Sequence, residues 1–313
     1  MGAGRNSWIY SRAIGSGCGQ SCKDNRGGTA MSKNRENRVQ FLELIAAKIR
    51  RNVLDICMQR GGYAGQGVAL AEIAACLYFD ELRPDENQWF YDRFVMSNGH
   101  DAIMSYGALA VHGSYSIEEL RTYNADGTKI DQSPIEGQLG FEITAGSLGQ
   151  GPSQAAGIAY GERLKASDKR IYCLFSDGEI QEGNVWEAAM FAGHQKLSNL
   201  VYIIDNNNLG ATGSTQEILG VEPVPEKFEA FGFAARRING NSVEEVLEAF
   251  EEAKQTSNKP YAMVCDTRLF EGISCLQSAL PTAHYVAVDD ADWQAGLDEI
   301  NQRISDLTAQ ACN

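Results

Sequence analysis

Basic residues are few in this 313-residue chain, and long apolar runs are missing. Lys and Arg number 27 against 41 Asp and Glu, which gives a net charge of −14. Phosphate-backbone binding needs clustered cations, so this balance argues against nucleic acid as a partner. No apolar run approaches the ~18–20 residues of a membrane span, and residues 1–31 contain no continuous apolar segment typical of a signal peptide. The composition therefore argues against both nucleic-acid and membrane partners.

Cysteine pairs are also missing in the sense that matters for metal or redox motifs. The chain has eight cysteines, but none of them form a C-x-x-C pair. Cys57, Cys76 and Cys173 lie within apolar patterns, where a thiol packs as a small hydrophobic group. Cys18 and Cys22 lack two further ligands nearby, so we interpret them as incidental. This usage is typical of a reduced compartment and predicts a cytoplasmic location.

Two regions of different character divide the chain. Residues 1–31 are rich in Gly and Ser and show no hydrophobic periodicity, which predicts a disordered N-terminal tail. From residue 32 the pattern is regular. Residues 32–313 are therefore expected to form one large domain.

Short apolar runs alternate with helical patterns in the second half of the chain. Buried strands are expected at 171–175, 200–204, 233–238 and 261–266. Earlier, 69–79 is expected to be one continuous apolar helix, and 124–143 a long loop. Strand–helix alternation predicts an α/β fold with a mostly parallel sheet and helices on both faces. Ligands of such sheets bind at the carboxyl ends of the strands.

Oxygen-bearing groups follow two of these expected strands. Asp177 and Gly178 come after the first strand, and Asn207 and Leu209 come after the next. A carboxylate, an amide oxygen and the backbone carbonyl of Leu209 are hard ligands suited to Mg²⁺ or Ca²⁺. They leave coordination positions that a diphosphate can fill. The alternative is that Asp-Gly and Asn-Asn are only turns, and either dipeptide alone favours that interpretation.

The longer context carries a family resemblance. Residues 176–189 read S-D-G-E-I-Q-E-G-N-V-W-E-A-A and residues 205–209 read D-N-N-N-L. Together they resemble the thiamine-diphosphate motif of transketolases, with Ser176 in place of the usual first glycine. Residues 97–101 (S-N-G-H-D), 144–151 (T-A-G-S-L-G-Q-G) and 192–200 also resemble transketolase segments. The resemblance covers about residues 35 to 285, and it implies a thiamine-diphosphate-binding fold.

The resemblance implies a role for each matching position. Asp177, Asn207 and the carbonyl of Leu209 would hold Mg²⁺, and Gly178 and Asn207 would contact the diphosphate. His100 and His284 would contact cofactor phosphate or the reacting substrate, and Glu182 matches an interface glutamate; we count these three as catalytic candidates. The aminopyrimidine would lie against backbone atoms of a glycine-rich segment: Gly146, Ser147 and Leu148. Thiamine diphosphate would supply the reactive carbon, and the protein would position it.

Two positions depart from the family pattern. Tyr63 and Ser133 stand where transketolases carry histidines that face sugar hydroxyls. A phenol and a hydroxyl still form hydrogen bonds, but neither titrates near neutral pH. We therefore expect an unusual donor or acceptor, such as a nonstandard sugar or a carrier-bound acyl acceptor. The alternative is that other residues take over these roles.

The resemblance also implies a partner chain. Only residues 286–313 follow the matching region, where full transketolases continue with a pyrimidine-binding and a C-terminal domain. We therefore expect an N-terminal subunit of a split transketolase, completed by a C-terminal subunit in an α₂β₂ assembly. The leading prediction is two-carbon ketol transfer to an aldose or another acceptor. The alternatives are the α-subunit of a 2-oxo-acid dehydrogenase and a non-catalytic scaffold subunit.

Overall fold

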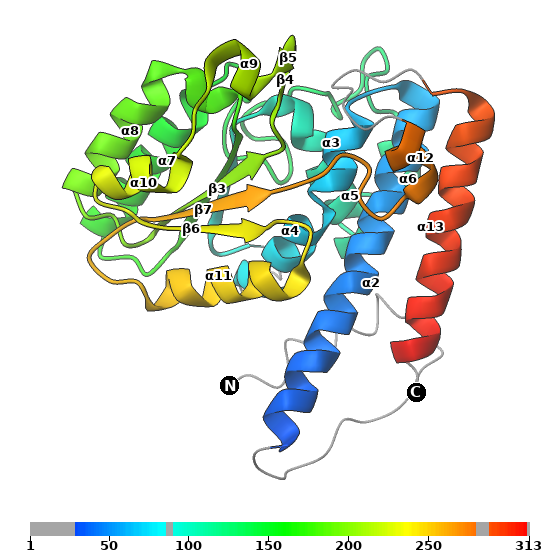
Figure 1. The fold of residues 1–313 in the computed structure, drawn as a ribbon, viewed down its shortest axis with the longest axis horizontal. Coiled ribbons are helices and arrows are strands. Elements are labelled where there is room, and N and C mark those ends of the chain that lie inside the picture. The colour runs from blue at the N-terminus through cyan, green and yellow to red at the C-terminus, as the bar shows by residue number, and fades with distance from the viewer. Residues whose placement is uncertain (1–28, 86–89, 280–287, 312–313) are drawn as a thin grey trace.

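A five-stranded parallel sheet forms the centre of the computed structural model, which describes residues 29–85, 90–279 and 288–311 (Figure 1). The strands lie in the order β1-β2-β3-β7-β6, and every neighbouring pair is parallel. Their bounds are β1 (Arg93–Met96), β2 (Ile171–Ser176), β3 (Leu200–Asn206), β6 (Ala234–Asn239) and β7 (Tyr261–Asp266). The predicted α/β class with a mostly parallel sheet is confirmed.

Helices cover both faces of the sheet, and this explains why its inner strands are apolar on both sides. Every residue of β2 and β3 is buried. One face packs against α7 (Gln150–Leu164), α8 (Gly183–His194) and α10 (Val224–Ala230). The other face packs against four helices, which Figure 1 shows beside the sheet: α2 (Thr29–Arg60), α4 (Ala71–Cys76), α5 (Ala102–His112) and α11 (Val243–Gln255).

Short elements connect this framework, and one long helix closes it. The C-terminal helix α13 (Asp290–Ala311) runs along α2 (Figure 1). The short elements are α3 (Ala64–Ala69), the π-helical turn η1 (Leu77–Glu81), the 3₁₀ turns η2 (Gly99–Asp101) and η3 (Glu179–Gln181), α6 (Ile117–Leu120), the β4 (Leu209–Gly210) and β5 (Gly213–Ser214) hairpin, α9 (Thr215–Leu219) and α12 (Ser274–Ala279). Residues 124–143 form the expected loop without regular structure. None of the described helices is long and apolar enough to cross a membrane.

Two expectations about the N-terminal half need comment. The continuous helix predicted at 69–79 is wrong, because the chain breaks at Leu70 into α3 and α4 and then changes to the π-helical η1. Gly65 and Gly67 lie within α3, where a Cβ on Gly67 would press on Ile103 and Val53; this close packing fixes the short segment where periodicity alone does not. The tail predicted at 1–31 lies outside the described residues up to position 28, and α2 begins at Thr29.

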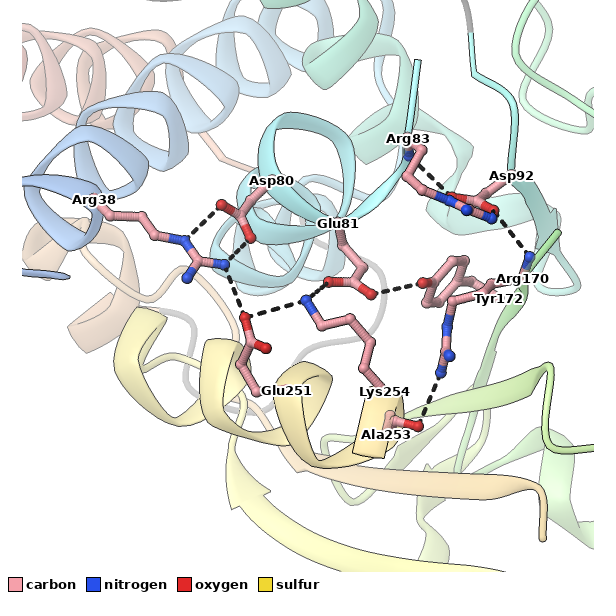
Figure 2. Close-up of polar contacts among 10 residues, drawn as sticks. All are labelled: Arg38, Asp80, Glu81, Arg83, Asp92, Arg170, Tyr172, Glu251, Ala253 and Lys254. Carbon is pink, nitrogen blue, oxygen red and sulfur yellow. Dashed lines mark hydrogen bonds and ion pairs between the residues drawn. The ribbon is translucent and has the colours of Figure 1, made fainter. Parts of the chain in front are cut away.

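A polar network ties the helices to the amino ends of the strands, opposite to the edge where the metal ligands were predicted (Figure 2). Glu81 accepts hydrogen bonds from the Tyr172 hydroxyl at 2.7 Å and from Lys254 at 2.9 Å. Asp92 is buried, pairs with Arg83 at 2.7 Å and accepts the backbone N–H of Arg170 at 2.9 Å. Because each of these buried carboxylates is paired with a cation, we interpret this edge as a structural base.

Gly193 offers a direct test of the packing on the α7–α8 face. A Cβ at this position would overlap the backbone carbonyl of Phe231. We expect Gly193→Ala to lower the free energy of unfolding by about 2 kcal/mol or more, because backbone cannot move aside as a side chain can. Urea unfolding measures this.

A matched control lies on the neighbouring helix. Gly157 is in the middle of α7, and a Cβ there meets nothing within 4 Å. Gly157→Ala should raise stability by about 0.5–1 kcal/mol through helix propensity alone. Equal effects of the two substitutions would contradict the packing assigned to Gly193.

Candidate functional site

The residues predicted to hold a metal meet at the carboxyl edge of the sheet. Strands β2 and β3 pair in the register Ser176↔Asp205, so the loops that follow them leave the sheet side by side. The backbone N–H of Asp177 donates to the carbonyl of Asp205 at 2.9 Å. The structure therefore brings together the two strand-end segments that are far apart in the sequence.

Asp177 is buried and held by three donors. Its Oδ1 accepts the N–H of Gly178 at 2.9 Å, and its Oδ2 accepts the N–H of Asn208 at 2.8 Å and the Thr215 hydroxyl at 3.1 Å. Burial, and then the nearby carboxylate of Asp205, raise the pKa of Asp177 to about 7. A carboxylate whose charge is so poorly compensated by the protein is suited to bind a cation.

Asn207 and Leu209 lie next to this carboxylate. The Asn207 side chain donates to Asp205 at 2.7 Å, and its Oδ1 accepts the N–H of Leu209 at 2.9 Å. A Cβ at Gly178 would lie 3.9 Å from the carbonyl oxygen of Leu209, so glycine keeps this space open. The amide and carbonyl oxygens thus flank the same small space as Gly178.

The donor chemistry here fits Mg²⁺ together with a phosphate ligand. Among the described residues, no group of three or more His, Cys, Asp or Glu side chains could hold a metal by itself. The available ligands are instead one carboxylate, one amide oxygen and one backbone carbonyl, all of them oxygens. Mg²⁺ in proteins is commonly bound by one or two carboxylates and completed by substrate phosphates.

The two glycine-containing segments, residues 97–100 and 144–151, contact each other beside this site. The N–H of Gly146 donates to the carbonyl of Ser97 at 3.4 Å, and a Cβ on Gly99 would lie 3.1 Å from that same nitrogen. Gly146 has φ +114°, a conformation that other residues rarely adopt. Ser147 and Leu148 follow it with exposed side chains, and Leu148 is 41% exposed. The backbone at Gly146–Leu148 is therefore accessible to a ligand.

His100, Tyr63 and Ser133 also lie together. The rings of Tyr63 and His100 are 5.1 Å apart, centroid to centroid. The hydroxyl of Ser133 lies 3.2 Å from the Cβ position of Gly146 and 3.3 Å from that of Gly99. Burial lowers the pKa of His100 to about 4, so the imidazole is neutral at physiological pH. The two residues that depart from the family pattern thus neighbour the histidine that keeps it.

Two of the predicted residues are placed differently from the rest. Glu182 is exposed and immediately precedes α8, and its Cβ lies 2.7 Å from the Cβ position of Gly149. An exposed side chain at this position suits a surface role. His284 lies outside the described residues, so its predicted role stays a prediction.

Comparison with known proteins decides which family this arrangement belongs to. Residues 42–299 match the family model described as transketolase, thiamine diphosphate binding domain. An apulose-4-phosphate transketolase component from Phocaeicola vulgatus is 31% identical, over 86% of this chain and 97% of the relative. The chain belongs to the transketolase family.

Further relatives agree with this transketolase assignment. A 6-deoxy-6-sulfo-D-fructose transketolase subunit of Clostridium sp. is 35% identical over 77% of this chain and 89% of the relative. The solved transketolase of Leishmania mexicana superposes with a TM-score of 0.71 and 26% identity, over 86% of this chain. The chain spans about half the length of that structure, since it covers 47% of it.

Three buried carboxylates of this transketolase site were missed in the sequence. Asp205 accepts from Thr267 and Asn207, Asp101 accepts from Asn98, and Glu179 accepts from Ser97. Burial raises the pKa of all three, that of Glu179 to about 7. The available signal was their position, because Glu179 and Asp205 belong to the strand-end motifs and Asp101 follows His100 directly.

Proposed function

We propose that this chain catalyses transfer of a two-carbon ketol unit, with thiamine diphosphate and Mg²⁺, as one subunit of a split transketolase. The observation that carries the proposal is the convergence of Asp177, Asn207 and the Gly146–Leu148 backbone at one edge of the sheet. The family assignment supports the cofactor. The oxygen-only donor set supports Mg²⁺.

The chain's own residues would act as a holder for the cofactor. Asp177, Asn207 and the Leu209 carbonyl would bind Mg²⁺, and the open space at Gly178 would admit the diphosphate. The backbone of Gly146–Leu148 would support the aminopyrimidine. Bound thiamine diphosphate supplies the carbon nucleophile for ketol transfer. Neutral His100, next to Tyr63, would donate or accept a hydrogen bond at the substrate.

A second subunit would complete the active site. Relatives that match this chain over most of their length are named as transketolase subunits, which supports a separate partner with the pyrimidine-binding domain. Exposed apolar side chains on the cofactor-side loops and on α7 to α9 would lie in the interface: Leu148, Leu164, Met190, Phe191, Ile218 and Leu219. An α₂β₂ assembly is the arrangement that we propose.

The donor or acceptor is proposed to be a nonstandard sugar. Tyr63 and Ser133 neighbour His100 and Gly146, so their departure from the family histidines changes the substrate end of the site. Two of the relatives carry the names of unusual sugars, apulose 4-phosphate and 6-deoxy-6-sulfo-D-fructose. This supports an altered sugar over the carrier-bound acceptor considered from the sequence.

The test of this function is a turnover assay of the chain co-purified with its partner. Thiamine diphosphate, Mg²⁺, xylulose 5-phosphate and ribose 5-phosphate are supplied, and seven-carbon product is measured. We expect tight cofactor binding and little seven-carbon product. Ready product formation would overturn the altered specificity, and absence of cofactor binding in the complex would favour the scaffold alternative. Turnover of a 2-oxo acid would favour the dehydrogenase alternative.

Restoring both family histidines should recover ordinary transketolase activity. We expect Tyr63→His combined with Ser133→His to raise kcat/KM for xylulose 5-phosphate at least tenfold, about 1.4 kcal/mol of transition-state stabilisation. The reason is that an imidazole offers sugar hydroxyls both a donor and an acceptor. Tyr91→His, near the opposite edge of the sheet, is the matched control. An unchanged kcat/KM in the double variant would show that Tyr63 and Ser133 do not set specificity.

A further inference from the structure

Glu179 is a buried carboxylate that joins the three cofactor segments. It begins η3 directly after the Asp177–Gly178 pair, and it is fully buried. Its Oε1 accepts the Ser97 hydroxyl and also the backbone N–H of Gly149 at 2.6 Å. One side chain of the metal-binding loop thus holds both the segment before His100 and the segment after Gly146.

The hydrogen bonds run in one direction through Ser97. The N–H of Gly151 donates to the Ser97 Oγ at 2.9 Å, and the same hydroxyl donates onward to Glu179. Since a hydroxyl has a single proton to donate, the Ser97 hydroxyl must point at Glu179 while it accepts from Gly151. Only a residue with an acceptor oxygen at position 179 satisfies both Ser97 and Gly149.

The packing around this link is too tight to leave an alternative arrangement. A Cβ on Gly151 would overlap the Ser97 side chain, and one on Gly149 would lie 2.7 Å from the Cβ of Glu182. Gly149 has φ +81°, which places its N–H toward Glu179 in a conformation that glycine adopts freely. The position of the Gly146–Gly151 backbone therefore depends on the acceptor at residue 179.

We infer that Glu179 is a positioning residue that fixes the Gly146–Gly151 backbone for the aminopyrimidine end of the cofactor. The inference rests on the proposed function, and it assigns Glu179 no contact with the cofactor or the metal. Its second oxygen, Oε2, is buried and makes no hydrogen bond within the described part of the chain. The function of the side chain is therefore carried by Oε1 alone.

The test compares two ligands that share a diphosphate but differ in the aminopyrimidine. Binding of Mg²⁺–thiamine diphosphate and of Mg²⁺–pyrophosphate to the full chain is measured by calorimetry. We expect Glu179→Leu, which removes the acceptor, to raise the Kd for thiamine diphosphate at least tenfold and to change the Kd for pyrophosphate less than threefold. Glu179→Gln keeps an acceptor oxygen and should rescue thiamine diphosphate binding to within about threefold of wild type.

Two further variants separate positioning from general destabilisation. Glu81→Gln alters another buried glutamate, in the network of Figure 2, and should leave both Kd values unchanged. Ser97→Ala should weaken thiamine diphosphate binding, and adding it to Glu179→Leu should cost little more, because both changes break the same link. Should Glu179→Leu change the two Kd values by the same factor, or neither of them, the inference is overturned alone. A wild-type chain that binds neither ligand overturns the proposed function, and this inference with it.

Discussion

Asp177→Ala is expected to raise the Kd for Mg²⁺-dependent thiamine diphosphate binding by at least about 100-fold, which corresponds to roughly 2.8 kcal/mol. Asp177 supplies the one carboxylate in the proposed ligand set, and an amide and a carbonyl oxygen cannot replace its charge. Removing it also leaves the diphosphate without a compensated cation in a chain with a net charge of −14. Calorimetry with and without Mg²⁺ measures the effect.

The fold should survive this substitution. Asp177→Ala leaves the Asn208 N–H and the Thr215 hydroxyl without their acceptor, but it also removes a carboxylate whose burial is itself unfavourable. Circular dichroism and urea unfolding should therefore show a native chain. Asp92→Asn is the matched control, since Asp92 is a comparably buried aspartate just before β1, at the opposite edge of the sheet. It should lose stability and keep cofactor affinity; the same Kd in Asp177→Ala as in wild type would remove the metal assignment.

The cofactor-free chain is expected to become less stable as pH rises from 6 to 8. Burial raises the pKa of four carboxyl groups at the carboxyl edge, Asp101, Asp177, Glu179 and Asp205, with those of Asp177 and Glu179 at about 7. In the folded chain they hold protons that the unfolded chain, with carboxyl pKa values near about 4, has already released. Their stabilising effect is complete below about pH 4 and is lost as pH rises through the folded pKa.

The size of this pH effect follows from the number of groups. Each contributes at most about 1.4 kcal/mol per pH unit, so the total between pH 6 and 8 is several kcal/mol. We expect Tm to fall by roughly 5–10 °C, which thermal unfolding at constant ionic strength measures. His100 opposes the trend, because its lowered pKa favours the neutral folded form as pH rises through about 6.5. It is one group against four and changes the total by less than about 1 kcal/mol in this window.

A variant and a ligand check the origin of the pH effect. Asp101→Asn removes one of the four titrating groups and should flatten the dependence of stability on pH. Mg²⁺–thiamine diphosphate should stabilise the chain more at pH 8 than at pH 6, because at pH 8 the carboxylates no longer have to release protons to meet a cation. A stability that is constant or rises between pH 6 and 8 in the cofactor-free chain would show that these carboxylates are ionised in the fold.

Local sequence determined the strands, the cofactor motif and much of the helical framework. The strand predicted at 261–266 matches β7, and the runs at 171–175 and 200–204 lie within β2 and β3. These strands are short, apolar on both faces and bounded by turn residues, so the pattern is unambiguous. Asp177 and Asn207 were predictable as neighbours because both follow parallel strands, whose carboxyl ends share one edge.

Other features were decided by contacts that no local pattern contains. The sheet order places β7 between β3 and β6, and β1 is an edge strand of only four residues, Arg93–Met96. The break at Leu70 likewise depends on packing of α3 against α5 and α2. A short segment with few apolar residues has too weak a period to identify, and strand order depends on which helices pack on each face.

The chemistry of the site divides in the same way. The sequence by itself determined that a carboxylate, an amide and glycine-rich loops would gather where a diphosphate and Mg²⁺ can bind, because each motif is local. Only the tertiary structure placed Tyr63 against His100, and only it joined Ser97, Gly149 and Glu179, which lie up to 82 residues apart. The physical reason is that a buried polar group must find its partner in whatever the fold brings next to it, and sequence distance does not limit that choice.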